Sequence, residues 1–312
     1  MWYNIIGDNM ATREELNKDK HKKIASEKEK EEKRKKIVFT FKLIVFSIIF
    51  ITALFFYITY ISNLHIIVRE NRIVSKKIPN SFNGTKIIQF SDIHFGTTIT
   101  KNELSNLVKI INSRKPDIVV FTGDLINKDY ELSSKELEEI ISALNKINPP
   151  LGKYAIRGEE DDESFITIFN QCNFTILNND YELIYKDDTT PILLVGVDNK
   201  PDINKAFKYY KDSNYNSNIF TTTILHKPDY VEEINSLSYK SDIYLAGHSH
   251  NGQIRIPFLG TPLRKKGSQK YYNEYYNLKN SKLYITSGIG TNGSGIRLFT
   301  HPSINLFRLS NK

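Results

Sequence analysis

The hydrophobic positions of the chain form one long apolar run and many short ones. The long run, residues 43–61, contains nineteen consecutive residues without a charge. The short runs are four to six residues long and have Gly, Pro, Asn or Asp close by, which is typical of buried strands. On this pattern we predict strands at residues 86–91, 117–122, 154–157, 192–197, 221–225, 243–246, 283–286 and 304–309.

Segments with helical spacing separate the first of these strands. In residues 104–111 the apolar positions recur every three or four residues, and Thr100 with Glu103 just before them forms the pattern of a capping box. Residues 133–147 predict a second amphipathic helix, which an Asn-Pro-Pro sequence ends. Helices in the first half and mostly strands in the second favour an α/β layered domain over an all-β one.

The pattern divides the chain into four parts. Residues 1–36 are predicted as a charged tail and residues 37–61 as an apolar segment. Residues 62–78 are predicted as an edge strand or a linker, and residues 79–312 as one domain.

The apolar segment is long enough to cross a membrane. As a helix, residues 43–61 would be about 28 Å long, close to the roughly 30 Å hydrocarbon core of a bilayer. Core helices seldom run this far without a polar face, so we predict a membrane span. The run exceeds the apolar region of about 7–15 residues of a cleaved secretory signal, and no small-x-small site follows it. We therefore predict an uncleaved signal anchor.

Basic residues flank this segment unequally. Residues 18–36 contain ten Lys and Arg, against four in residues 69–77. By the positive-inside rule, the N-terminus is predicted in the cytoplasm and the domain outside, as in a single-pass protein of the cell membrane. The reverse topology, with an intracellular domain, stays an alternative.

The net charge of +8 and the single cysteine exclude other classes of protein. Residues 79–312 contain 27 Lys and Arg against 26 Asp and Glu, so the excess charge flanks the apolar segment and the domain itself is almost neutral. A nucleic-acid-binding domain would carry its own basic face, and none is expected here. Cys172 alone forms no intrachain disulfide and no Cys-based zinc site, and we predict it to be buried.

Side chains that bind metals follow five of the predicted strands. In chain order these are Asp92-Ile93-His94, Gly123-Asp124, Gly158-Glu159-Glu160-Asp161, His226 and Gly247-His248-Ser249-His250. Ligands of α/β proteins usually bind at the carboxyl ends of the strands. A single histidine here would more often be structural, but four of the seven histidines at strand ends indicate a site.

These side chains predict a centre with two metals. Carboxylates and imidazoles without thiolates suit Mn, Fe or Zn. Six or seven such ligands are too many for one ion, whereas two divalent ions about 3.5–4 Å apart, bridged by a shared carboxylate, would use them all.

The order D-x-H, GD, a G-N-H-[DE]-like turn, H and GH-x-H resembles the calcineurin-like metallophosphoesterase superfamily. The stretches GHSHNGQIRIPFLG and YITSGIGTNGSGIRLFTHPSINLFRL resemble its membrane-associated bacterial branch. The similarity covers about residues 65–312, and five blocks in one order are far more specific than any block alone. It implies a four-layer α/β/β/α sandwich that hydrolyses phosphoesters by in-line attack of a metal-activated hydroxide.

The resemblance also implies metal ligands by position. The first metal would be held by Asp92, His94 and His250, the second by His226 and His248, with Asp124 as the bridge. Lys227 would add phosphate affinity, although a surface lysine is the plainer interpretation.

The third block departs from the family, because Glu159-Glu160 stands where Asn-His is expected. Glu159 replaces a metal-binding amide, and a carboxylate also binds metal. Glu160 replaces the histidine that assists the leaving group, and it would have to keep a proton to do so. The plainer interpretation is an acidic loop, residues 158–163, that leads into a helix at residues 164–170.

Two functional hypotheses follow. The first is a membrane-anchored enzyme that hydrolyses a phosphoester, predicted to be a phosphodiester of a lipid or of the cell envelope, with Asp124 and Glu160 as catalytic residues. The second is a module that binds metal or phosphate in the same pocket but has lost turnover, because Glu159-Glu160 replaces Asn-His.

Overall fold

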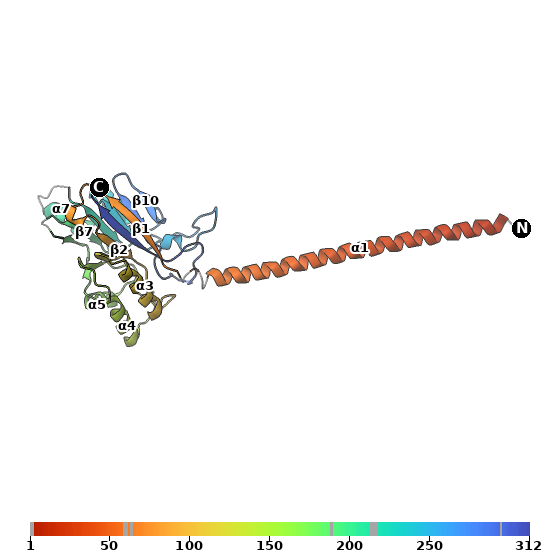
Figure 1. Cartoon of the computed structure of the whole chain (residues 1–312), viewed down its shortest axis with the longest axis horizontal. Coiled ribbons are helices and arrows are strands. Elements are labelled where there is room, and N and C mark those ends of the chain that lie inside the picture. The colour runs from red at the N-terminus through yellow and green to blue at the C-terminus, as the bar shows by residue number, and fades with distance from the viewer. Residues whose placement is uncertain (1–2, 59–61, 63–64, 188–189, 213–217, 294) are drawn as a thin grey trace. The chain divides into compact units, whose positions relative to one another are not determined.

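The computed structural model of the chain describes residues 3–58, 62, 65–187, 190–212, 218–293 and 295–312. The chain divides into two units, Met1–Tyr57 and Ile58–Lys312 (Figure 1). The predicted end of the apolar segment at residue 61, and residues 63–64 of the predicted linker or strand, lie outside the described residues.

The first unit is a single long helix, α1 (Tyr3–Phe56). Its first half is charged, with ion pairs one turn apart between Lys33 and Glu29 and between Lys35 and Glu31. Its second half is long and apolar enough to cross a membrane, and none of the residues in its most apolar stretch is buried. This part of α1 is therefore a candidate membrane span.

The second unit contains two six-stranded sheets. The order in the first sheet is β1-β12-β2-β3-β4-β5, and in the second it is β10-β11-β9-β8-β7-β6. The first sheet consists of β1 (Ile67–Val74), β2 (Lys86–Phe90), β3 (Ile118–Phe121), β4 (Lys153–Ala155), β5 (Thr175–Ile176) and β12 (Ser303–Ser310). The second consists of β6 (Asp180–Ile184), β7 (Ile192–Val197), β8 (Thr221–Leu225), β9 (Ile243–Ala246), β10 (Tyr275–Asn277) and β11 (Lys282–Ile285).

Strand direction decides where the loops gather. Strands β2, β3, β4 and β5 are parallel to one another, and so are β7, β8, β9 and β11. Strand β12 runs antiparallel to β2, and β1 runs parallel to β12 at the edge of the sheet. Because the parallel strands of each sheet end at one edge, the loops that follow them are brought together there.

Helices cover the outer faces of both sheets. The first sheet is covered by α3 (Lys101–Ser113), α4 (Ser134–Leu144) and α5 (Glu163–Gln171), which Figure 1 shows on one side of it. The second is covered by α6 (Ile203–Ala206), α7 (Tyr209–Asp212) and α8 (Tyr230–Ser236). Two short 3₁₀ helices, η2 (Asn80–Phe82) and η3 (His250–Gly252), lie in loops.

Three hydrophobic cores hold the layers together. In β2, Ile88 and Phe90 pack against α3–α5, whereas Ile87 faces the second sheet, as the alternation of a strand dictates. The middle core joins the two sheets, and the third joins the second sheet to residues such as Phe207 and Val231 of its helices. The predicted α/β/β/α order of layers is thereby confirmed.

Most predicted elements are present with nearly the predicted bounds. β7, β8 and β9 begin and end at the predicted residues, and α3 has the predicted capping box of Thr100 and Glu103. The segment predicted as an edge strand or a linker is strand β1, at the edge of the first sheet. The predicted helix at residues 133–147 is shorter, because α4 ends at Leu144.

Three strands, β5, β6 and β10, were not predicted. They are short or only half-buried, so the alternation of apolar and polar residues that marks a strand is weak in them. Cys172 is buried as predicted, with its thiol near the carbonyl oxygen of Ile141, and burial raises the pKa of the thiol to about 11. That pKa disfavours the thiolate and supports a packing role.

Candidate metal centre

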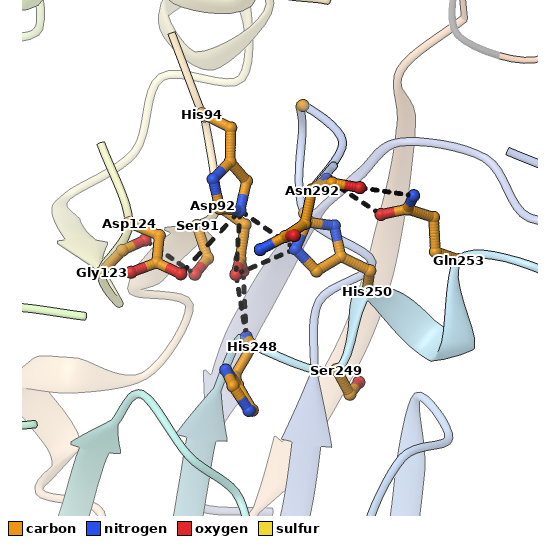
Figure 2. A network of polar contacts seen from close by, with 12 residues as sticks. Ser91, Asp92, His94, Gly123, Asp124, His248, Ser249, His250, Gln253 and Asn292 are labelled. Atoms are coloured by element: carbon orange, nitrogen blue, oxygen red, sulfur yellow. Dashed lines mark hydrogen bonds and ion pairs between the residues drawn. The ribbon is translucent and has the colours of Figure 1, made fainter. Parts of the chain in front are cut away.

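All the predicted site residues lie at one edge of the two sheets. Asp92 and His94 follow β2, Asp124 follows β3, and the acidic turn at residues 158–161 follows β4. The second sheet contributes one residue after β8 and two after β9, His226, His248 and His250. In Figure 2 the labelled carboxylates and imidazoles converge just beyond the strand ends.

The first cluster consists of Asp92, His94 and His250, whose side chains are fully buried. Nε2 of His250 lies 3.4 Å from Oδ1 of Asp92 and 3.1 Å from Nε2 of His94. Two ring nitrogens at this distance require a proton or a cation between their lone pairs. The three side chains therefore enclose a position that a shared proton or one metal ion can occupy.

The second cluster consists of Asp124, His226 and His248, also fully buried. Oδ2 of Asp124 lies 3.1 Å from Nε2 of His226 and 3.8 Å from Nε2 of His94 in the first cluster. The same carboxylate oxygen thus faces both clusters. This is the placement that a bridging ligand requires.

The hydrogen bonds of three histidines leave the correct nitrogen free for a metal. Nδ1 of His94 bonds to Glu160, Nδ1 of His226 donates to the carbonyl oxygen of Thr122 at 2.7 Å, and Nε2 of His248 donates to that of Lys266 at 2.8 Å. Metal-binding histidines usually donate their other ring N–H in this way. The remaining nitrogens, Nε2 of His94 and His226 and Nδ1 of His248, all belong to the two clusters.

Several buried ligand atoms have no hydrogen-bond partner among the described residues. They are Oδ2 of Asp124, Nε2 of His226 and Nδ1 of His248, all in the second cluster. Leaving a buried polar atom unpaired costs about 1–3 kcal/mol, so three in one place need an explanation. The donor set of carboxylate oxygens and imidazole nitrogens fits divalent ions such as Mn, Fe or Zn.

The backbone of the site is strained where it supplies ligands. Asp92, His94, Asp124, His248 and His250 all have positive φ, between 45° and 65°. Asp and His tolerate this left-handed conformation better than most residues, but it still has an energetic cost. Five such residues in one site indicate that the fold orients these side chains at a cost in conformational free energy.

Two glycines allow the loops to approach closely. A Cβ atom on Gly158 would lie 2.1 Å from Oδ1 of Asp124, and one on Gly247 would lie 2.5 Å from Oδ2 of Asp92. Any side chain at either position would displace a carboxylate of the clusters. These glycines are therefore needed for the close approach.

The electric field of the site favours positive charge. Burial alone would raise the pKa of Asp124, but His226 outweighs it and the pKa is lowered. Burial lowers the pKa of His226, yet Asp124 raises it to about 9. Burial, together with the charge of His226, lowers the pKa of His248 to about 2. The carboxylates thus draw a proton onto the nearest imidazole, and the same field attracts a cation.

Glu159 and Glu160 point in different directions. Oε1 of Glu159 lies 3.4 Å from Nδ1 of His248, beside the second cluster, and its Oε2 forms a 2.9 Å ion pair with Lys227. Oε2 of Glu160 lies 3.1 Å from Nδ1 of His94 and accepts from the backbone N–H of Lys128 at 2.9 Å. Glu160 thus supports the first cluster and Glu159 borders the second.

The charge of Glu160 follows from these contacts. Burial raises the pKa of Glu160, but the hydrogen bond and the charge of His94 outweigh it, so that the pKa is lowered. A third donor, the side-chain amide of Asn292, contacts Oε1 at 2.5 Å. Asn292 was not predicted as a site residue: it lies in the stretch at residues 284–309 that resembles the family, but no carboxylate or imidazole next to it marked its position.

Asp161 is a second residue that sequence reasoning did not assign. Its carboxylate accepts from the backbone N–H groups of Gly158, Asp124 and Leu125, each at 2.8 Å. It therefore ties the loop after β4 to the loop after β3. The plainer interpretation of the acidic turn does hold for Asp162, which caps the N-terminus of α5 through Ser164.

Comparisons with known proteins agree with this geometry. The family described as calcineurin-like phosphoesterase matches residues 85–252. The metallophosphoesterase YkuE of Bacillus subtilis (strain 168) is 30% identical over 249 residues, which cover 77% of this chain and 84% of YkuE. LpxG of Chlamydia muridarum, named UDP-2,3-diacylglucosamine pyrophosphatase, is 24% identical over 301 residues, with 74% of this chain and 86% of LpxG covered.

The chain is also similar to a protein whose name describes it as transmembrane. The Danio rerio protein named "Transmembrane protein with metallophosphoesterase domain" is 27% identical over 251 residues, which cover 73% of this chain and 54% of that protein. The family match spans more than half of the chain and includes the residues after β2, β3, β4, β8 and β9. The chain therefore belongs to the calcineurin-like phosphoesterase family.

Proposed function

We propose that the protein is a membrane-anchored phosphoesterase with two divalent metal ions. One ion would be held by Asp92, His94 and His250, the other by His226, His248 and Glu159, with Asp124 between them. When bound, such a pair of ions supplies Lewis acidity and activates water for attack on phosphorus. The observation that carries the proposal is the convergence of buried carboxylates and imidazoles in two clusters that Oδ2 of Asp124 faces, with unpaired ligand atoms in the second.

We assign Glu160 chiefly to positioning. The pKa of its carboxyl group is lowered, so the group is a carboxylate that accepts a hydrogen bond from the Nδ1–H of His94. This contact fixes the ring tautomer in which Nε2 is left for a metal. Protonation of the leaving group by Glu160 is the second candidate role. It requires the carboxyl group to carry a proton while it is held by His94, Lys128 and Asn292.

The proposed substrate is a phosphoester, most simply a phosphodiester, linked to a lipid or to the cell envelope. Two observations support it: the candidate span in α1, and the name of LpxG, a relative that acts on an acylated sugar nucleotide. The excess of basic residues before the span supports a cytoplasmic N-terminus and an extracytoplasmic domain. Protease accessibility in intact cells against spheroplasts tests that orientation, because an intracellular domain would be cut in neither until the cells are lysed.

Hydrolysis of bis-p-nitrophenyl phosphate by the full chain in detergent tests the enzymatic part. We expect turnover that needs added Mn²⁺ and is lost on chelation, together with about two equivalents of metal per chain. Absence of bound metal, or of metal-dependent turnover on any phosphoester, rejects the proposal.

A binding module without turnover is the alternative, and Glu159-Glu160 is the observation that favours it. The double substitution Glu159→Asn, Glu160→His restores the family sequence. A sharp rise in turnover would show that the two acids silence the site. An unchanged or lower rate would show that they work in the native mechanism.

A further inference from the structure

The chain enters the phosphoesterase domain at the same edge as the candidate metal centre. β1 is antiparallel to β2, so its first residue, Ile67, lies at the edge where β2 ends. Ile67 pairs with Ser303, and the N–H of Ser303 donates to the carbonyl oxygen of Gly288. The N–H groups of the next two residues, Ile289 and Gly290, donate to the carbonyl oxygen of Asp92. The site and the start of the domain are therefore neighbours.

Residues between α1 and β1 are also held at this edge. The carbonyl oxygen of Ile58 accepts from the N–H of Arg297, and Oγ of Ser62 donates to the carbonyl oxygen of Arg297 at 3.0 Å. From Ile58 to Ile67 the chain has nine residues, which span about 30 Å at most when fully extended. The connection between the candidate span of α1 and the domain is therefore short.

Large apolar side chains are exposed at this edge. We call the side chains of Ile256, Phe258, Leu259, Leu263 and Phe299 the apolar loop patch. Phe258 is fully exposed, and Leu259 and Leu263 are 70% and 77% exposed. Such a group of exposed apolar residues marks an interaction surface rather than ordinary surface variation.

The two loops of the patch are built to display these side chains. They are joined by a bridge between Ile254 and Leu298 and by the N–H of Arg255, which donates to Leu298 at 2.9 Å. Phe258 and Phe299 both have positive φ, a strained conformation for a bulky aromatic residue. The fold therefore holds both aromatic rings outward at an energetic cost.

A cavity of about 250 Å³ lies beside the patch. Its lining includes Ile254 and Leu263, Ser249 between two of the cluster histidines in the sequence, and Asn292, which donates to Glu160. Figure 2 shows how Gln253 is linked to Asn292 there, through a 3.0 Å hydrogen bond from the Asn292 N–H. The cavity therefore borders both an exposed residue of the patch, Leu263, and Asn292, a contact of Glu160.

Basic side chains lie between the patch and the site. Nζ of Lys265 is buried without a hydrogen-bond partner among the described residues, Lys265 lines the cavity, and the carbonyl oxygen of the next residue, Lys266, accepts from Nε2 of His248 at 2.8 Å. Arg264 stacks on the ring of Tyr272 at 3.9 Å, further out. Apolar residues flanked by basic ones are typical of surfaces that bind the interface of an anionic bilayer.

We propose that the apolar loop patch inserts into the bilayer that α1 crosses. An amphiphilic phosphoester would then enter the cavity from the bilayer, with its phosphate near Lys265 and its apolar part along Ile254 and Leu263. This inference rests on the proposed membrane span, and it names the lipid bilayer as the occupant of the patch. A second copy of the chain or a protein partner would cover the patch in a different way that the experiment detects.

The test uses the full chain in vesicles of phosphatidylcholine and phosphatidylglycerol. Phe258→Cys or Leu259→Cys carries an environment-sensitive fluorophore, and Leu237→Cys, an exposed leucine at the end of α8, is the matched control. Cys172 is buried, and the unsubstituted chain shows its background labelling. We expect quenching by lipid-borne quenchers at 258 and 259 but not at 237. Equal exposure of all three probes to water would overturn the proposal, as would shielding that varies with protein concentration instead of lipid.

A second measurement separates docking from catalysis. Leu259→Ser should hydrolyse bis-p-nitrophenyl phosphate at the unsubstituted rate, yet lose about tenfold on a fluorescent phospholipid phosphodiester embedded in the vesicles. Equal rates on the embedded ester would overturn the delivery role. If the unsubstituted chain hydrolyses neither ester, the proposed function fails, whereas lipid quenching at 258 would still support docking.

Discussion

The two clusters of the metal centre differ in their surroundings. In the first, Asp92, His94 and His250 are fully buried, and the Glu160 side chain behind His94 is only 9% exposed. The second cluster also has buried members, but Glu159 at its border is 32% exposed and shares its carboxylate with Lys227. One cluster is closed and the other opens toward solvent.

This difference indicates how each cluster responds to change. The first depends on hydrogen bonds that fix ring orientation, so a substitution there acts through geometry. The border of the second depends on an ion pair near solvent, which is screened and contributes less. Asp124 faces both clusters, and a change there should affect both.

The largest effect is expected for Asp124→Asn, which removes the shared negative charge with almost no change of shape. We expect both ions to be lost or to bind more weakly. Turnover should fall by at least about 100-fold, which is the upper end of the effect of removing a residue that only contacts a metal ligand. Asp129→Asn is the matched control, because Asp129 is exposed in the same loop and has a similar φ of 65°. Metal analysis that still finds two full equivalents in Asp124→Asn would contradict the bridging position.

Gly158→Ala should have the next largest effect, because its Cβ would collide with Oδ1 of Asp124 and with the backbone N of Asp124. We expect weaker metal binding at both clusters and a lower melting temperature. Circular dichroism with and without Mn²⁺ measures the melting temperature and its dependence on the metal. Gly84→Ala has open space around the new Cβ and a positive φ of 83° that Gly158 does not have, so it gives an upper limit, about 1 kcal/mol, for the cost of replacing a glycine without a collision. Equal metal affinity in the two variants would show that the approach of residue 158 to Asp124 is not needed.

Glu160→Gln separates the clusters. It removes the negative charge that faces Nδ1 of His94 and should lower the affinity of the first cluster by about tenfold, while the second cluster stays near its native affinity. Competition with a metal chelator resolves the two affinities. The pH profile of turnover then tells the two proposed roles apart: loss of its alkaline limb would favour proton donation by Glu160 over positioning, because a general acid must carry a proton to act.

The smallest effect is expected for Lys227→Met, which breaks the 2.9 Å ion pair with Glu159. A partly exposed pair contributes at most about 1 kcal/mol, so the melting temperature of the metal-free protein should change little. Freed from Lys227, Glu159 should bind the second ion more tightly, by a factor of a few at most, in the same competition assay. A large loss of turnover on anionic esters would instead give Lys227 a direct role toward phosphate.

The sequence was sufficient for most of the strand positions and for the members of both clusters. Strands such as β7 and β9 are nearly continuous apolar runs, because a strand that is buried on both faces has apolar side chains on both. The ligands directly follow such strands, so locating the strands also locates Asp92, Asp124 and His226. Strands that are half-buried, such as β6, have no comparable local signal.

Only the tertiary structure decided which partner each ligand has. The sequence predicted a role for Glu160 toward the leaving group but not its contacts: it bonds to His94, and Asn292 reaches it from 132 residues away in the sequence. The exposed patch near the metal centre likewise depends on pairing between Ile254 and Leu298, which no periodicity indicates. Apolar periodicity records whether a residue is buried, because burial acts on each side chain separately. Hydrogen-bond partners and shared edges depend on how distant segments pack, and that information is not local.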